Sequence, residues 1–342
     1  MPVFVVGSPR SGTTLLYDML MSAGGFAIYL GESSIFNVVA PRFGNLGVRK
    51  NRDKMWNAWL GSRLFRASGI EPRSIESKML ENCRNAGDFL RTIMEEIARN
   101  QNARRWAGNT PEETLYLPLI KKTIPDALFI HVIRDGRDVA LSLSRRRYIK
   151  PFPWKERETA IGAAIYWQWI LKKGRRIGRT FGSDYTEIRF EQLVSDPRSA
   201  LNNLSSFLDH ELDYDRIQRT ALGSVSQPNT SFKTQSPQEF NPVERWKKDL
   251  TADEVAKIEE LIGETLIELG YGLANLETRH SWPGLVGEKF VYHSFFEAKL
   301  WAKNSAVIRA IRPALSSEEI DEIVVVDENG PEKVRQLTVE AH

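Results

Sequence analysis

The segment that most constrains the fold is a glycine-containing stretch at residues 7–14, which reads Gly-Ser-Pro-Arg-Ser-Gly-Thr-Thr. It follows an apolar, β-branched run at residues 2–6, which is typical of a buried parallel strand. After it, residues 13 to about 23 carry leucine and methionine at helical spacing. A strand, a glycine turn and a helix in this order predict a loop whose backbone N–H groups bind a phosphate. The alternative is an ordinary turn between a strand and a helix that happens to use two glycines.

The loop has the spacing of a P-loop but lacks its lysine. Thr13 occupies the lysine position, and the nearest cation is Arg10, inside the loop. A nucleotide kinase needs the lysine on the β- and γ-phosphates of its nucleotide, and a hydroxyl on magnesium. The sequence therefore predicts an anionic ligand that differs from magnesium-bound ATP, and a P-loop kinase is the less favoured alternative.

Composition limits the classes of protein that fit. At 342 residues the chain can bury one large core or two small ones. Its formal net charge of +3 allows anionic ligands but does not predict a nucleic-acid partner. The single cysteine, Cys83, excludes an internal disulfide and a cysteine-rich metal site. No run predicts a membrane span and no signal peptide precedes the first strand, so we expect a cytoplasmic protein.

Two further strands are predicted at residues 127–133 and 185–190, and segments with helical periodicity follow them. Strands that alternate with helices predict a parallel sheet covered on both faces. The expected fold class is α/β, a three-layer αβα sandwich with a P-loop-like first unit. Such sheets bind ligands at the carboxyl ends of their strands, where the 7–14 loop and Arg134 would both lie. A shorter strand-like segment covers residues 26–30.

The rest of the chain divides into an insertion, a loop and an extension. Residues 42–106 predict a helical insertion that lines a substrate cleft, although each tryptophan in it is better explained as a core anchor. Residues 223–242 have no periodicity and predict a long loop. We assign residues 1–274 to a catalytic domain and residues 275–342 to an extension with a basic, aromatic helix and an acidic tail. That helix could face a membrane, form a dimer or pack on the main domain, and packing is favoured.

A second anion site is predicted at the end of the 127–133 strand. Arg134 directly follows the strand, and Ser142 lies about two helical turns further on, roughly on the same face. An arginine and a hydroxyl at a strand end can bind a second phosphate. Two alternatives stay open. Arg134 could pair with a local acid such as Asp138, or the strand could end in a kinase-type magnesium ligand, although an arginine directly after the strand counts against the latter.

The two motifs together resemble the sulfotransferase family, which uses 3′-phosphoadenosine 5′-phosphosulfate. Residues 7–16, Gly-Ser-Pro-Arg-Ser-Gly-Thr-Thr-Leu-Leu, resemble that family's 5′-phosphosulfate loop. Residues 132–142, Val-Ile-Arg-Asp-Gly-Arg-Asp-Val-Ala-Leu-Ser, resemble its 3′-phosphate motif. Weaker support comes from residues 189–197 and 245–250. The resemblance runs from residue 2 to about residue 272, and the arginine in the loop is closer to the bacterial and tyrosylprotein enzymes than to the cytosolic ones.

The resemblance implies a donor site that requires no metal. A sulfuryl group carries one negative charge fewer than a phosphoryl group, so metal neutralisation is less necessary. Arg10 and the loop N–H groups would stabilise the charge that develops on the bridging oxygen. The implied donor contacts are Arg10, Ser11, Gly12, Thr13 and Thr14 at the phosphosulfate, Arg134 and Ser142 at the 3′-phosphate, and Arg146 and Lys233 as further phosphate contacts.

The resemblance also implies a catalytic base and shows one departure. Glu32 matches a Gly-Glu pair of the tyrosylprotein-type enzymes, and it is the only carboxylate between Asp18 and Asp53. As a general base it would take the proton of the acceptor. An exposed loop glutamate is the alternative. Related enzymes often have lysine before Thr-Pro, where this chain has Asn109, which can donate a hydrogen bond but carries no charge.

These features predict an enzyme that transfers sulfate by in-line displacement. The expected acceptor is a hydroxyl or an amine of a carbohydrate, a lipid or a small metabolite. A homodimer is allowed, and no nucleic acid is expected as a partner. Because of Asn109, a protein that binds the donor nucleotide with weak or no turnover is the alternative.

Overall fold

The protein is built around a four-stranded sheet. The computed structural model describes residues 1–150, 159–225, 241–274 and 283–326. The strands, in their order across the sheet, are β3 (Ala107–Asn109), β1 (Val3–Gly7), β4 (Leu128–Ile133) and β5 (Tyr185–Arg189). Each neighbouring pair is parallel. The strands expected at residues 127–133 and 185–190 are confirmed.

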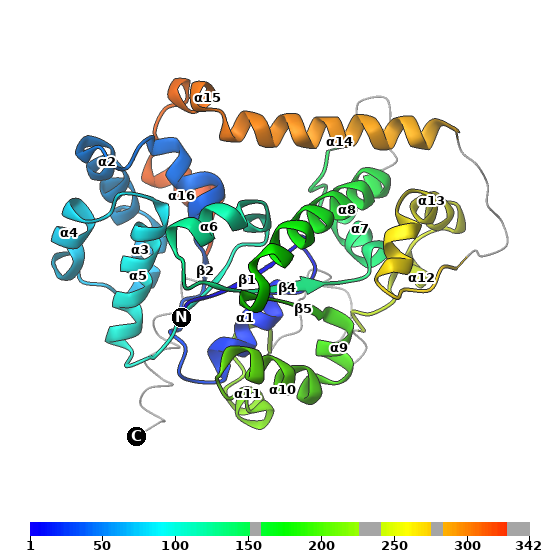
Figure 1. Ribbon diagram of the computed structural model, residues 1–342, viewed down its shortest axis with the longest axis horizontal. Coiled ribbons are helices and arrows are strands. Elements are labelled where there is room, and N and C mark those ends of the chain that lie inside the picture. The colour runs from blue at the N-terminus through cyan, green and yellow to red at the C-terminus, as the bar shows by residue number, and fades with distance from the viewer. Residues whose placement is uncertain (151–158, 226–240, 275–282, 327–342) are drawn as a thin grey trace.

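Helices cover both faces of the sheet (Figure 1). They are α1 (Thr13–Ser22), α9 (Phe190–Ser195), α10 (Pro197–Leu208) and α11 (Tyr214–Thr220) on one face, and α6 (Leu117–Thr123), α7 (Gly136–Arg145) and α8 (Thr159–Gly178) on the other. Alternate side chains of β1 enter different cores, because successive residues of a strand point to opposite faces. Val3 and Val5 pack with α1 and α10, whereas Phe4 and Val6 pack with α6. The predicted three-layer αβα sandwich is confirmed.

Helices form in the predicted insertion, at the left of Figure 1, but none of residues 42–106 lines the cavity at the carboxyl ends of the strands, so its role in a substrate cleft stays a prediction. Its helices are α2 (Arg49–Leu60), α3 (Arg63–Ser68), α4 (Pro72–Glu81) and α5 (Ala86–Asn100), preceded by the short turns η1 (Ile35–Val39) and η2 (Ala40–Phe43). Trp56 and Trp59 stack with ring centroids 5.4 Å apart, inside the core that also receives Phe4. Trp106 meets the Phe4 ring edge-on. These tryptophans are core anchors, as the sequence predicts for each of them.

The strand predicted at residues 26–30 is wrong. The backbone N–H and carbonyl of Ile28 are both bound by the side-chain amide of Gln101, at 2.7 and 3.0 Å. The polar backbone groups of Ile28 are therefore already used, and the pairing of this segment with residue 105 ends at an isolated bridge from Phe26. The chain instead forms a later strand, β2 (Gly31–Glu32), which pairs with β6 (Val325–Val326) and lies outside the main sheet.

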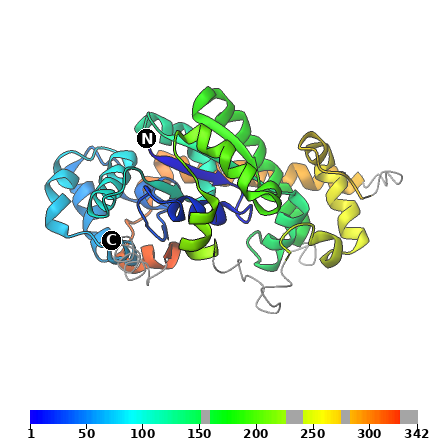
Figure 2. The same ribbon diagram turned by 90° about the horizontal axis from the view of Figure 1, so that it is seen from below.

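The chain after residue 241 adds helices around the sandwich. They are α12 (Trp246–Asp249), α13 (Ala252–Glu268), α14 (Pro283–Asn304), α15 (Ala306–Ile311) and α16 (Ser317–Ile323). α14 lies across α8 (Figure 1), and α16 lies against α2, beside the insertion (Figure 2). The acidic run expected as a tail is thus part of a helix. Ser316 and Glu319 form its capping box, and Ile320 is fully buried.

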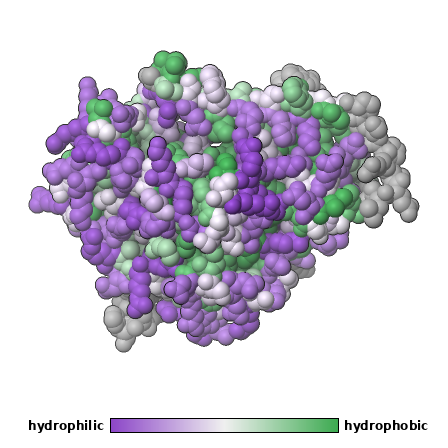
Figure 3. Space-filling model, viewed as in Figure 1, coloured by the Kyte–Doolittle hydropathy of each residue, from purple (hydrophilic) through white to green (hydrophobic). Residues whose placement is uncertain are grey.

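The outer side of α14 and α15 is apolar. Phe290, Trp301 and Ile311 are 73%, 69% and 76% exposed. Apolar residues are visible along the upper edge of the molecule, over these two helices (Figure 3). Among the helices that the structure describes, none combines the length and the hydrophobicity needed to span a bilayer.

Candidate active site

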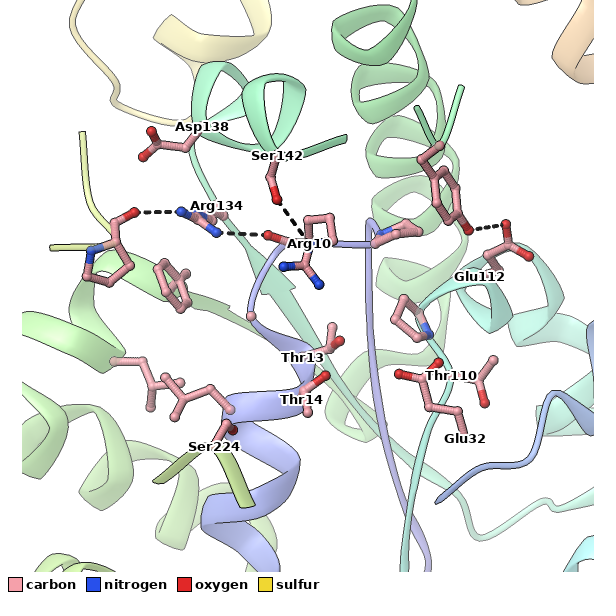
Figure 4. Close-up of a pocket in the computed structure, with 18 of the residues that line it drawn as sticks. Arg10, Thr13, Thr14, Glu32, Thr110, Glu112, Arg134, Asp138, Ser142 and Ser224 are labelled. Atoms are coloured by element: carbon pink, nitrogen blue, oxygen red, sulfur yellow. Dashed lines mark hydrogen bonds between the residues drawn. The ribbon is translucent and has the colours of Figure 1, made fainter. Parts of the chain in front are cut away.

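One cavity brings most of the predicted site residues together. It has a volume of about 570 Å³ and lies at the carboxyl ends of β1, β3 and β4, where parallel sheets bind ligands. The predicted residues that line it are Arg10, Gly12, Thr13, Thr14, Glu32, Arg134, Ser142 and Arg146. Ser11 is fully buried next to them. Figure 4 shows Arg10 between the Arg134 side of the cavity and the Glu32 side.

The loop between β1 and α1 forms one wall of this cavity. Arg10 and Gly12 adopt left-handed φ angles of 73° and 94°, which turn the chain into a concave anion site. The first N–H groups of α1 have no partner within the helix, and the positive end of its dipole lies at the same place. The Ser11 hydroxyl is buried and has no hydrogen-bond partner among the described residues. This arrangement suits a phosphate or a sulfate.

Gly12 is required for steric reasons. A Cβ at this position would lie 2.2 Å from Cδ2 of Phe190, the first residue of α9. We expect Gly12→Ala to lower the free energy of unfolding by about 2–5 kcal/mol, from this clash and from the strain of a left-handed alanine. Urea denaturation measures the change.

The matched control for this substitution is Gly69→Ala. Gly69 has a φ of 64°, but a Cβ there would have no atom within 4 Å. Only the backbone strain applies, so a loss of about 1–2 kcal/mol is expected. Equal losses in the two variants would contradict the clash at Gly12.

Arg134 is held beneath the loop by three contacts. Its Nη1 donates to the carbonyl of Arg10 at 3.0 Å, and its Nη2 donates to the carbonyl of Pro242 at 2.5 Å. Its guanidinium lies over the Phe190 ring, 4.5 Å from the centroid. Its Nε is buried and has no partner among the described residues. The side chain is therefore fixed in place, while none of the described residues accepts a hydrogen bond from its Nε–H group.

Ser142 connects the two predicted anion sites. It lies on α7 and accepts a hydrogen bond from Nε of Arg10 at 3.0 Å. Asp138, one turn earlier, accepts from two backbone N–H groups of residues 244–246, each at 2.9 Å. The Asp138 carboxylate is thus hydrogen-bonded to backbone. Burial raises its pKa to about 6 and the charge of Arg134 opposes this shift, so the alternative in which Arg134 pairs with Asp138 stays open.

Asp135, the acid that closely follows β4, is bound by a neighbouring arginine. Asp135 accepts from the side chain of Arg137 at both of its oxygens, at 3.1 and 2.7 Å. Arg137 also forms an ion pair with Glu259 of α13, at 2.5 Å. These contacts anchor the start of α7. The geometry does not fit the alternative in which this acid is a kinase-type magnesium ligand.

Glu32 lies on the opposite side of the cavity from Arg134 (Figure 4). Burial raises the pKa of its carboxyl from an ordinary value of 4.5 to about 7, with Arg10 opposing the shift and Glu112 adding to it. A carboxyl with a pKa near neutrality can accept a proton from a hydroxyl and release it again. Glu32 is partly buried in β2, so it is not an exposed loop residue.

A second carboxylate borders the Glu32 end of the cavity. Glu112, in the short turn η3 (Pro111–Tyr116), accepts from the hydroxyl of Tyr148 at 2.6 Å and from the side-chain amide of Asn37 at 3.2 Å. Sequence reasoning missed Glu112 and Tyr148. The Thr-Pro pair directly before Glu112 was the available signal, because it marks the segment that follows β3.

Asn109 is the residue at which the sequence resemblance implies a lysine. It ends β3, next to β1, and is 4% exposed. Its Oδ1 is buried and has no partner among the described residues. Thr110 follows it and lines the cavity beside Glu32 (Figure 4). The uncharged amide of Asn109 is therefore buried next to a residue that lines the cavity.

Arg146 and Lys233 are the two remaining residues predicted to contact phosphate. Arg146, just after α7, lines the cavity. Burial lowers the pKa of Arg10 to about 10, and the positive charge of Arg146 is the second cause of this shift. Lys233 lies outside the described residues. Phe190 and Pro242, which hold Arg134, were missed as site residues, although Phe190 belongs to the 189–197 segment that the sequence singles out.

Comparison with known proteins identifies the family. The profile described as "Sulfotransferase family" matches residues 2–214. The chain belongs to the sulfotransferase family. It is therefore a transferase, an enzyme that moves sulfuryl groups from a sulfate donor. This assignment places the 7–14 loop, Glu32 and Arg134 all within the part of the chain that matches the family.

Curated relatives and solved structures agree with this assignment. Protein-tyrosine sulfotransferase A of Caenorhabditis elegans is 25% identical over 279 residues, which cover 79% of this chain and 67% of the relative. A putative protein-tyrosine sulfotransferase of Caenorhabditis briggsae is 22% identical over 296 residues, or 82% of this chain and 92% of the relative. The sulfotransferase domain from the curacin biosynthetic pathway has a TM-score of 0.50 at 17% identity, covering 80% of this chain and 99% of that domain. This likeness supports the fold.

Proposed function

We propose that this sulfotransferase takes its sulfuryl group from 3′-phosphoadenosine 5′-phosphosulfate and transfers it to a hydroxyl group. The observation that carries the proposal is the polarity of the cavity. Arg134 and a helix N-terminus lie at one end, the Glu32 carboxyl, with a pKa of about 7, lies at the other, and Arg10 lies between them (Figure 4). The first end suits a donor with two anionic groups, and the second suits an acceptor that must lose a proton.

The donor would be held at two points. The 7–14 loop, with Arg10, binds the phosphosulfate through its N–H groups and hydroxyls. Arg134 and Ser142 bind the 3′-phosphate, with Arg146 and Lys233 as further contacts. Support comes from two buried polar atoms without partners among the described residues, Oγ of Ser11 and Nε of Arg134. Burial of such atoms costs free energy unless a ligand binds them.

Transfer would proceed by in-line displacement at sulfur. The acceptor oxygen attacks the sulfur while the bond from sulfur to the 5′-phosphate oxygen breaks, and the acceptor proton passes to Glu32. Negative charge grows on the departing oxygen, where Arg10 and the loop N–H groups stabilise it. Arg10 stays protonated at neutral pH, because its pKa falls only to about 10. Since Asn109 is uncharged, Arg10 supplies the charge that the family lysine would provide.

The acceptor would be an uncharged hydroxyl group, either an alcohol or a phenol, on a carbohydrate, a lipid or a small metabolite. An amine is the less favoured acceptor. Among the described residues, the charged side chains that line the acceptor end are Glu32 and Glu112. Two carboxylates would repel an anionic acceptor. The name of the Caenorhabditis elegans relative refers to protein tyrosine, which is also a phenol, so a tyrosyl peptide belongs among the acceptors to be tested.

Transfer of radiolabelled sulfate tests the proposal. The protein is incubated with labelled 3′-phosphoadenosine 5′-phosphosulfate and a panel of phenols, sugars, lipid alcohols, amines and tyrosyl peptides. Label is expected in at least one hydroxyl acceptor, with no need for ATP. Tight donor binding without transfer to any acceptor would favour a nucleotide-binding protein that has lost turnover, and magnesium-dependent consumption of ATP would favour a kinase.

Arg134→Ala is expected to weaken binding of adenosine 3′,5′-bisphosphate by about 1–3 kcal/mol, or roughly fivefold to 150-fold. The variant loses a charge-assisted contact to the 3′-phosphate. Isothermal titration calorimetry measures the change. Arg176→Ala is the control, because Arg176 is an exposed arginine on α8. Equal affinities in the two variants would show that Arg134 does not bind the donor.

A further inference from the structure

The carboxyl-terminal elements contribute a side chain to the cavity. Ile323, the last residue of α16, lines it together with Glu32 and Val38. Ile323 is 39% exposed, whereas its neighbour Val324 is 5% exposed. One apolar side chain of this segment therefore borders the cavity while the next fills the core.

The same segment completes the strand that carries Glu32. β2 pairs with β6 in an antiparallel ladder, with Glu32 opposite Val325 and Gly31 opposite Val326. In the described part of the chain, β6 is the strand that pairs with β2, since β2 does not join the main sheet. Backbone pairing restrains a strand residue, so the position of Glu32 depends on the segment that follows α16.

Asp321 fixes this segment to the insertion. Its Oδ1 accepts from the backbone N–H of Arg63 at 2.6 Å, and its Oδ2 pairs with Arg66 at 3.4 Å. Its carbonyl also accepts from the Arg63 guanidinium. Ile320 and Leu315 add apolar contacts in the core of the insertion, where they are 0% and 4% exposed. The segment is therefore docked by ionic, backbone and apolar contacts together.

We infer that residues 313–326 form the acceptor-side wall of the active site, in which Ile323 sets the size of the acceptor and Asp321 is a positioning residue for β2. The inference rests on the proposed function, because it takes the Glu32 end of the cavity as the acceptor end. Val38, Pro111 and Ile323 give that end an apolar lining. Such a lining suits the ring of a phenol or the hydrocarbon part of an alcohol.

Substitutions at Ile323 test the size role. Ile323→Trp narrows the acceptor end, and Ile323→Ala widens it. Steady-state kinetics with para-nitrophenol and the larger beta-naphthol should show that Ile323→Trp raises the KM for beta-naphthol about tenfold relative to that for para-nitrophenol. Ile323→Ala should shift this ratio in the opposite direction. Affinity for adenosine 3′,5′-bisphosphate should stay nearly unchanged in both variants.

The control is Ile311→Trp, because Ile311 is an apolar residue of α15 that is 76% exposed. If wild-type protein sulfates neither phenol, the affinity of beta-naphthol for the protein loaded with adenosine 3′,5′-bisphosphate gives the same comparison. An unchanged preference between the two phenols in both Ile323 variants would overturn the inference.

Hydrogen–deuterium exchange tests the positioning role without any acceptor. Asp321→Ala should release the segment from the insertion, so the amides of residues 31–32 should exchange about tenfold faster. Glu322→Ala is the control, because Glu322 is the neighbouring acid and is exposed. Unchanged exchange in Asp321→Ala would overturn this role. Failure of the wild-type protein to bind adenosine 3′,5′-bisphosphate would instead reject the proposed function, while the exchange result still decides whether Asp321 holds β2.

Discussion

Glu32→Gln is expected to lower kcat by about 10²–10⁴-fold, while the affinity for adenosine 3′,5′-bisphosphate stays nearly unchanged. Glutamine has almost the same shape as glutamate but cannot accept the proton of the acceptor. The nucleotide contacts come from Arg10, Arg134 and the 7–14 loop, which this change leaves in place. Steady-state sulfate transfer measures kcat, and calorimetry measures the nucleotide affinity.

The pH dependence of the reaction should report the same group. Burial raises the pKa of Glu32 to about 7, so the carboxyl is protonated, and cannot act as a base, below that pH. The rate should therefore rise as the pH increases through about 7 and level off above it. A glutamate with an ordinary pKa would already be ionised at pH 6. In Glu32→Gln the rise should disappear.

Glu76→Gln provides the control, because Glu76 is an exposed glutamate on α4. Its kcat and its pH profile should match those of the wild-type protein. Full turnover by Glu32→Gln would contradict the assignment of the base and would make Glu112, at the same end of the cavity, the next residue to test.

Arg10→Ala is expected to lower kcat by about 10²–10³-fold, the usual cost of removing one donor that stabilises transition-state charge. Arg10 is a cation of the loop, and Asn109, where the sequence resemblance implies a lysine, is uncharged. Loss of Arg10 therefore leaves the departing oxygen with the loop N–H groups alone. Alanine keeps a Cβ at the left-handed φ of 73°, so the backbone strain of the loop is unchanged.

The Arg10→Lys variant separates charge from geometry. Lysine keeps the positive charge but loses the planar guanidinium, whose Nε binds Ser142 at 3.0 Å. Turnover should recover in part. If Arg10→Ala instead raised the KM for the donor and left kcat intact, Arg10 would bind ground state and transition state equally well, and its proposed role in charge stabilisation would be wrong.

The features that depend on short stretches of sequence were predictable. The 7–14 loop, its flanking strand and helix, and the strand before Arg134 each have a local pattern of hydrophobicity and glycine. Parallel pairing of β1 with β4 then places the loop and Arg134 at one edge of the sheet. This is why the sequence could predict that the loop and Arg134 lie close together, although more than a hundred residues separate them.

The features that depend on distant contacts were not predictable. The hydrogen bond from Nε of Arg10 to the Ser142 hydroxyl could not be predicted, because it joins side chains from two motifs that meet only in the folded protein. The 26–30 segment forms only an isolated bridge, between Phe26 and Arg105, because a glutamine side chain from the insertion binds the backbone groups of Ile28. Likewise, no local pattern indicates that β6 would pair with β2 or that Ile323 would border the cavity.

Calorimetry with two nucleotides tests the central claim, that one cavity holds both anionic groups of the donor. Adenosine 3′,5′-bisphosphate is compared with adenosine 5′-monophosphate, which lacks the 3′-phosphate. The bisphosphate should bind at least about tenfold more tightly, since only it reaches Arg134. No heat with the bisphosphate, or equal affinity for the two nucleotides, would contradict the account.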